Sequence, residues 1–129
     1  MATFEQIGLV FQIIHNIYGL VANMRDNADG YKTQLATRPV ADIAAVMVAD
    51  AMQYKRRVQW ITDLAARNLA LFDASLGALN LTRADAISLR DTLLGVTNHT
   101  QAANLTSSTE ITTEADYILA TVPSFERLW

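Results

Sequence analysis

The chain contains no cysteine, so disulfide bonds, thiol catalysis and thiolate metal sites are excluded. It has only 2 prolines and 5 glycines, which leaves long stretches without a residue that breaks a helix. Charge is scarce as well, and the net charge of −3 is too small to indicate a polyanionic partner. With 51% hydrophobic residues, the chain has ample material for the core of one domain, which we assign to residues 1–129.

The residue types that carry chemistry are few and unsuitably spaced. The two histidines, His15 and His99, belong to neither a Glu-x-x-His nor a His-x-x-x-His pattern, so a metal site in a helical bundle lacks its ligands. The sequence has no glycine-rich phosphate loop after a strand, and no serine lies near a base. We therefore expect no catalytic activity, no cofactor and no metal. An enzyme would need a pocket with a perturbed acid or base, for example from Asp42, Asp50 or His15.

A seam of apolar residues at alternating steps of three and four runs through the N-terminal part of the chain. This spacing predicts one long helix from about Phe4 to about Leu35, packed along the seam. Between Glu5 and Arg25 that helix carries no charged residue. The seam consists of Ile7, Val10, Ile14, Ile17, Val21, Met24, Ala28, Tyr31 and Leu35.

Further large apolar residues lie beside the seam, so the helix is apolar over much of its circumference. A short chain offers few partners for such a helix, and each large side chain left in water forgoes about 1.5–3 kcal/mol. We therefore expect copies of the chain to cover part of this helix in an obligate oligomer. The apolar residues beside the seam are Leu9, Phe11, Ile13, Tyr18 and Leu20.

The opposite face of this helix is polar but nearly uncharged, and glycines recur on it at intervals of eleven residues, close to three turns. Amides beside glycines suit the close approach of a second helix, and they would also suit the lining of a narrow passage. The alternative is that the glycines align by chance on an ordinary polar face. The face comprises Gly8, Gln12, His15, Asn16, Gly19, Asn23, Asn27 and Gly30.

The uncharged stretch from Gln6 to Met24 is nearly long enough to cross a membrane. The polar residues within it, such as Gln12 and Asn16, would be costly facing lipid, so we expect no membrane span. We also expect no secretory signal peptide, because the first residues contain Glu5 and lack lysine and arginine.

A second helix is predicted from Pro39 to about Leu76, because no glycine or proline interrupts residues 40–76. At about 1.5 Å per residue it would span roughly 55 Å. A compact chain of this length is only about 36 Å across. The bundle is therefore elongated, or the helix breaks at an unmarked place, or it projects into a neighbour. Gly77 and Asn80 are plausible stop signals.

The remaining chain predicts two shorter helices. The first begins at Thr82, which Asp85 can help to cap. The polar stretch 105–112 is interpreted as a linker, and a C-terminal arm 113–129 contains a helix that Pro123 ends near Thr121. The apolar residues at the end of this arm suit burial, either on the chain's own bundle or on a neighbour. They are Phe125, Leu128 and Trp129.

A short basic run, Lys55-Arg56-Arg57, lies near Trp60 on the second predicted helix. Three consecutive residues spread over most of a helical turn, so they form no single basic stripe. The overall acidic balance of the chain also disfavours nucleic acid as a direct ligand. We interpret these residues as a solvated face or as partners in salt bridges to another subunit.

The sequence therefore predicts an all-α fold: an elongated bundle of two long antiparallel helices, a shorter third helix and a C-terminal helical arm. Residues 3–104 hold the main helices. The leading functional hypothesis is a structural subunit of a large homomeric assembly, such as a neck, tail, internal or shell protein of a virus or phage particle. The alternative is a small helical binding module or adaptor that acts through a groove between helices, as a monomer or dimer. The predicted subunit interface comprises Ile7, Phe11, Ile14, His15, Tyr18, Gly19, Asn23, Phe125, Leu128 and Trp129.

Overall fold

The computed structural model describes residues 4–125, and it describes side chains from residue 8 onward. This part of the chain is all-helical, as the sequence predicts, and it contains five helices and no strand. The helices are α1 (Phe4–Gln34), α2 (Val40–Arg67), α3 (Leu69–Ala78), α4 (Arg83–Ala102) and α5 (Ser108–Thr121).

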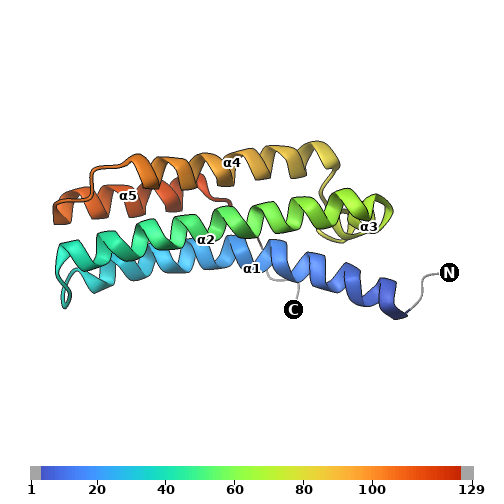
Figure 1. Ribbon diagram of the computed structural model, residues 1–129, viewed down its shortest axis with the longest axis horizontal. Helices are drawn as coiled ribbons and strands as arrows, with labels where there is room; N and C mark the ends of the chain where they lie inside the picture. Colours follow the sequence, from blue (N-terminus) through green and yellow to red (C-terminus); the bar gives the residue numbers. More distant parts are fainter. Residues whose placement is uncertain (1–3, 126–129) are drawn as a thin grey trace.

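The helices pack as an elongated bundle (Figure 1). The chain runs along α1, reverses in a short turn and returns along α2. In the view of Figure 1, α4 and α5 lie above this pair of helices, and α3 lies at one end of the bundle. Helix α1 packs against α2, α3 and α5, and α4 packs mainly against α2. This differs from the expected two long helices with a third helix and an arm, because α3 is a separate element and α5 lies along α1.

The chain's own helices cover most of the apolar surface of α1. Ile13, Ile14, Ile17 and Leu20 are all buried, at 1–6% exposure. These four side chains therefore need no cover from another copy, because three helices pack around α1 rather than two, since the chain breaks after α2 and α5 folds back. Phe11 on the same helix, by contrast, is 65% exposed. That copies of the chain cover part of this helix stays a prediction.

The long helix expected from Pro39 to Leu76 is broken at Asn68. Asn68 leaves the helical conformation at φ −141° and ψ 58°, and its N–H donates to the carbonyl of Ala65 at 3.1 Å. The break lets α3 turn onto α1, where Ser75 and Leu76 are 0% and 1% exposed. Neither glycine nor proline marks this position, but the side-chain amide of Asn68 donates to the carbonyl of Leu64 at 3.3 Å.

The turn between α3 and α4 follows the sequence signals closely. Asn80 adopts a left-handed conformation at φ 58°, and the N–H of Leu81 donates to the carbonyl of Leu76 at 2.8 Å. These are the features of a Schellman helix end, which confirms Asn80 as a stop signal. Thr82 then caps α4 in a reciprocal capping box with Asp85, also as predicted.

The segment expected as a polar linker, residues 105–112, is partly helical. Helix α4 continues to Ala102, and α5 begins at Ser108 because Ser107 accepts a hydrogen bond from the N–H of Glu110 at 3.1 Å. The C-terminal helix therefore starts about five residues earlier than expected. It ends at Thr121, two residues before Pro123, as the sequence predicts.

Candidate interaction surfaces

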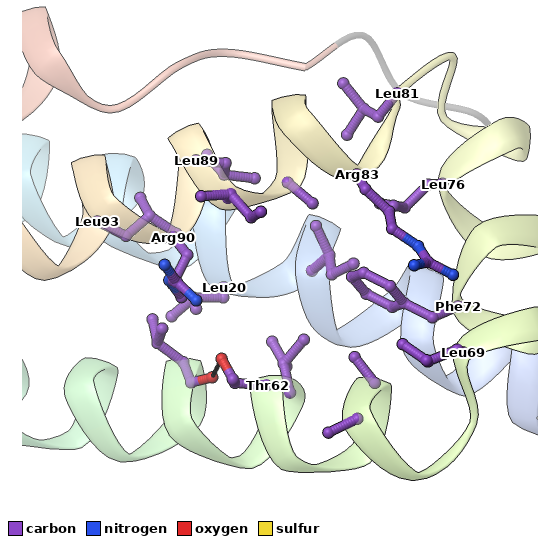
Figure 2. Close-up of a pocket in the computed structure, with 17 residues that line it drawn as sticks. Leu20, Thr62, Leu69, Phe72, Leu76, Leu81, Arg83, Leu89, Arg90 and Leu93 are labelled. Atoms are coloured by element: carbon purple, nitrogen blue, oxygen red, sulfur yellow. Dashed lines mark hydrogen bonds between the residues drawn. The ribbon is translucent and has the colours of Figure 1, made fainter.

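An apolar groove of about 260 Å³ lies between α2, α3 and α4. Figure 2 shows its lining, with side chains from all three helices and with Leu20 of α1 at its base. Almost every contributing side chain is aliphatic or aromatic, so the groove suits an apolar occupant. The lining includes Leu20, Thr62, Leu69, Phe72, Ile87 and Arg90.

Two large apolar side chains of the groove stay half in solvent. Leu69 on α3 is 49% exposed and Ile87 on α4 is 50% exposed. In a finished core these side chains would be covered, and the cost of leaving them wet is on the order of 1 kcal/mol each for half burial. Within residues 8–125, the groove therefore combines an apolar lining with large apolar side chains that are half exposed to solvent.

Two arginines of α4 border the groove (Figure 2). Arg83 forms two hydrogen bonds with Asp73 at 2.7 and 2.8 Å, which ties α4 to α3. This pairing holds the pKa of the Asp73 carboxyl below its usual range. Arg90 contacts only its sequence neighbour Asp91, at 3.1 Å, and both side chains are exposed. Arg90 is therefore the cation at the groove that can exchange its partner most easily.

The sequence analysis did not find this groove. The spacing of Ile87, Leu89 and Leu93 places them near one face of α4, but the spacing alone indicates no cleft. The groove exists because the chain turns at Asn68 and α3 leaves the line of α2, which opens space beside α4. A signal in the sequence was the width of the apolar face of α4, which exceeds what one neighbouring helix covers.

The second surface is the outer face of α1, which comprises Gly8, Phe11, Gln12, His15, Gly19 and Asn23. Phe11 is 65% exposed, and Gly8, Gln12, His15 and Asn23 are exposed as well. A Cβ atom on Gly8 would meet nothing within 4 Å, and one on Gly19 would meet only Arg57 Nη2 at 3.9 Å. The glycines of this face therefore serve no close contact within the chain.

A shallow hollow beside this face is lined by Gln12 and Asn16 of α1 and by Arg56, Arg57 and Trp60 of α2. Trp60 is 45% exposed. The basic run of α2 does not form one patch, as expected, because its members meet different helices. Lys55 Nζ donates to Asn98 Oδ1 on α4 at 3.4 Å, whereas Arg57 lies beside Gly19 of α1.

Eight of the ten predicted interface residues divide into three groups, and Tyr18 and Phe125 form a fourth that is described separately. Phe11, His15 and Asn23 lie exposed on the outer face of α1, where Gly19 is half-buried. Ile14 is 5% exposed and belongs to the interior of the chain. The side chain of Ile7, and Leu128 and Trp129, lie outside the described residues.

Tyr18 and Phe125 are brought together from opposite ends of the chain. The hydroxyl of Tyr18 donates to the carbonyl oxygen of Phe125 at 3.1 Å, and their ring centroids are 6.2 Å apart. Phe125 also packs against both apolar clusters of the bundle. The apolar end of the chain was expected either on its own bundle or on a neighbour. Phe125 lies on the chain's own bundle.

Two buried polar clusters escaped the sequence analysis. Between α4 and α5, Glu114 is 3% exposed and its Oε1 lies 2.7 Å from His99 Nδ1 and 3.0 Å from Thr100 Oγ1, while His99 stacks on Tyr117. The partners satisfy the buried carboxylate, as burial of a charge requires. The second cluster contains Tyr31 of α1 and Tyr54 of α2, which are 3% and 7% exposed. Neither cluster borders the groove, so we interpret both as structural.

Comparison with protein-family models, with curated proteins and with solved structures finds no match for this chain. Within residues 4–125, no helix has the length and apolar character needed to cross a membrane. The same part of the chain gathers no three His, Asp or Glu side chains that could hold a metal ion. The function is therefore argued from the groove and from the outer face of α1.

Proposed function

We propose that this chain is a structural, non-catalytic subunit of a large homomeric assembly. Its most concrete form is a component of a virus or phage particle, such as a neck, tail, internal or shell protein. Other copies of the chain, and other subunits of the assembly, are the partners in this proposal. Nucleic acid is not a direct ligand in it.

The outer face of α1 is the observation that carries this proposal. A helix face that only meets water normally carries lysine and glutamate, yet the exposed positions from Gly8 to Asn23 are all uncharged. Phe11 adds the most exposed large apolar side chain among the described residues. Uncharged amides, glycines without a neighbour and a wet phenylalanine together suit a second copy packed along this helix.

The first test is the mass of the purified chain. Native mass spectrometry and light scattering across micromolar concentrations should find discrete species of many copies, with a mass that depends on concentration. A single monomeric species across that range would contradict the proposal.

The second test replaces a glycine of the outer face. Gly19→Leu raises intrinsic helix propensity by about 0.8 kcal/mol, and the space around Gly19 within the chain is open. The variant should therefore fold with unchanged or greater helix content but lose copies from the assembly. Gly95→Leu on α4 is the matched control, because a Cβ at Gly95 meets nothing within 4 Å. If the two variants assemble equally well, the hypothesis that another copy packs closely on the outer face of α1 is contradicted.

A binding module is the second candidate function, and the apolar groove is the observation that favours it. A groove between helices of about 260 Å³ can accept the apolar side chains of an amphipathic partner segment. This function predicts a monomer or dimer in solution and a foreign protein or peptide in the groove. Mass measurement separates the two candidates, because only the first predicts species with many copies.

A further inference from the structure

We propose that the apolar groove binds a single-chain anionic amphiphile, a small molecule with one acidic head group and an alkyl chain of about ten carbon atoms. The head group pairs with Arg90, and the alkyl chain lies along α4 toward Phe72. This inference goes beyond the proposed function, which concerns the outer face of α1, and neither depends on the other.

The volume of the groove sets the length of the alkyl chain. An apolar cavity of about 150 Å³ holds benzene, a ring of six carbon atoms. At the same space per atom, the groove of about 260 Å³ holds about ten carbon atoms. The groove therefore suits an alkyl chain of medium length.

The placement of the two arginines gives the groove a direction. Arg83 and Arg90 lie seven residues apart on α4, so they are roughly 10 Å apart along the helix axis and near the same face. Figure 2 shows Arg90 at one end of the lining and Arg83 beside Phe72 at the other. An extended alkyl chain that starts at Arg90 therefore follows α4 and ends at the ring of Phe72.

The apolar side chains between these ends are the ones that gain from an occupant. Leu69 and Ile87 line the groove and are 49% and 50% exposed, so they mark its opening to solvent. An alkyl chain in the groove covers both of them. The burial of this apolar surface is the driving force for binding.

The described part of the chain leaves this opening uncovered. Phe125 packs against the cluster of Ile17 and Leu76, two residues that also line the groove. Phe125 itself does not belong to the lining, and Leu69 and Ile87 stay half exposed with Phe125 in its place. Among residues 8–125, therefore, no side chain closes the groove.

The charges that line the groove are of one sign. Arg83 and Arg90 belong to the lining, whereas none of its described residues is an aspartate or a glutamate. The chain as a whole carries a net charge of −3, so these cations stand out against its overall balance. An apolar groove lined by cations alone favours an anionic amphiphile over a neutral or cationic one.

Of the polar side chains in the lining, Arg90 is the one available to a head group. Arg83 donates to both carboxylate oxygens of Asp73 at 2.7 and 2.8 Å, and the hydroxyl of Thr62 donates to a main-chain carbonyl within α2 at 2.8 Å. Arg90 contacts only the exposed Asp91, and its own side chain is 41% exposed. It can therefore turn to an acidic head group at the water-facing end of the groove.

The test measures the binding of sodium decanoate to the full-length chain by isothermal titration calorimetry, below the concentration at which decanoate aggregates. Decanoate should bind at one site per chain, with a dissociation constant on the order of 10–500 µM for a ligand of this size. Decanol has the same alkyl chain but no charge. It should bind about tenfold more weakly, because it loses a hydrogen bond between two charged groups.

Two pairs of variants locate the site. Arg90→Gln should lower the affinity for decanoate to that for decanol, whereas Arg56→Gln removes the same charge outside the groove and should change neither affinity. Ala66→Phe adds a ring at an exposed position of the lining and should abolish the binding of both ligands. Ala49→Phe, at an exposed position of the same helix outside the groove, should not. Circular dichroism checks that all four variants keep their helix content.

The outcomes separate this ligand from other occupants. Equal binding of decanoate and decanol overturns the acidic ligand and favours the apolar side chains of a protein partner. Binding that appears only after residues 126–129 are removed identifies the chain's own end as the occupant and also overturns the proposal. A fall in the mass of an assembly when decanoate is added, measured by native mass spectrometry, does the same by identifying a second copy in the groove.

The same measurements keep this inference distinct from the proposed function. A chain that assembles but binds no decanoate overturns the inference alone. A chain that binds decanoate but stays monomeric overturns the proposed function alone.

Discussion

At the scale of single residues, the most constrained groups are two tyrosines between α1 and α2. Tyr31 is 3% exposed and donates to a carboxylate oxygen of Asp50, and Asn27 donates to the hydroxyl oxygen of the buried Tyr54. Burial raises the pKa of Tyr31 far above its ordinary value, and the hydrogen bond to Asp50 raises it further. Burial also raises the pKa of Tyr54. Both side chains therefore resist ionisation in the folded chain.

This resistance predicts a loss of stability in alkali. An unfolded tyrosine ionises near pH 10, whereas the folded chain keeps these protons. Stability is therefore complete below about pH 10 and falls as the pH rises above it, toward the raised folded pKa. Urea unfolding of the wild type at about pH 8 and about pH 11 should show this loss. The Tyr31→Phe/Tyr54→Phe double variant should lose less over the same interval, and an equal loss would contradict the assignment.

At the scale of elements, α3 depends on contacts with α1 more than on its own sequence. It has ten residues, too short for a stable isolated helix. Leu76 anchors it in the cluster that also contains Ile13 and Ile17 of α1, and the hydroxyl of Ser75 donates to the carbonyl of Leu71 within α3. The direction of α3, and with it the groove, is therefore set by this anchor.

Two leucines of α3 test that account. Leu76→Ala should lower the free energy of unfolding by about 2–5 kcal/mol, because a buried side chain leaves a cavity. Leu69→Ala, in the same helix but 49% exposed, should cost less than about 1 kcal/mol. Urea unfolding at chain concentrations below the range of self-association measures both. Hydrogen exchange should show α3 opening in Leu76→Ala alone, and equal costs would contradict the anchoring role of Leu76.

At the scale of the whole molecule, Phe125 holds the end of the described chain against α1. Removing Glu126–Trp129 should weaken self-association but leave the unfolding free energy of a single chain nearly unchanged. Removing Phe125 as well should lower that free energy by roughly 1–3 kcal/mol, because its ring and carbonyl contact Tyr18. Sedimentation and urea unfolding of both truncated chains check this. A stability loss from the shorter deletion would contradict the assignment of that stability to Phe125.

The sequence by itself determined the helices whose ends carry local signals. Asn80, Thr82 and Pro123 act through backbone conformation, capping and a missing N–H, so their effects are readable within a few residues. The heptad seam likewise identified α1 and the face that it buries. Ser107 is a missed local signal, since it and Glu110 start α5 earlier than expected.

Tertiary structure alone decided where the long helix breaks, how α1 is covered and where the groove lies. No glycine or proline marks Asn68, and the break there lets Leu76 pack against Ile13 and Ile17 of α1. The apolar pattern suggested that other copies cover Ile14 and Leu20, but both side chains are buried within the chain. Helices α3 and α5 pack against α1 and contribute to this burial. Apolar periodicity shows that a face must be covered, whereas the identity of the covering helix depends on contacts far apart in sequence.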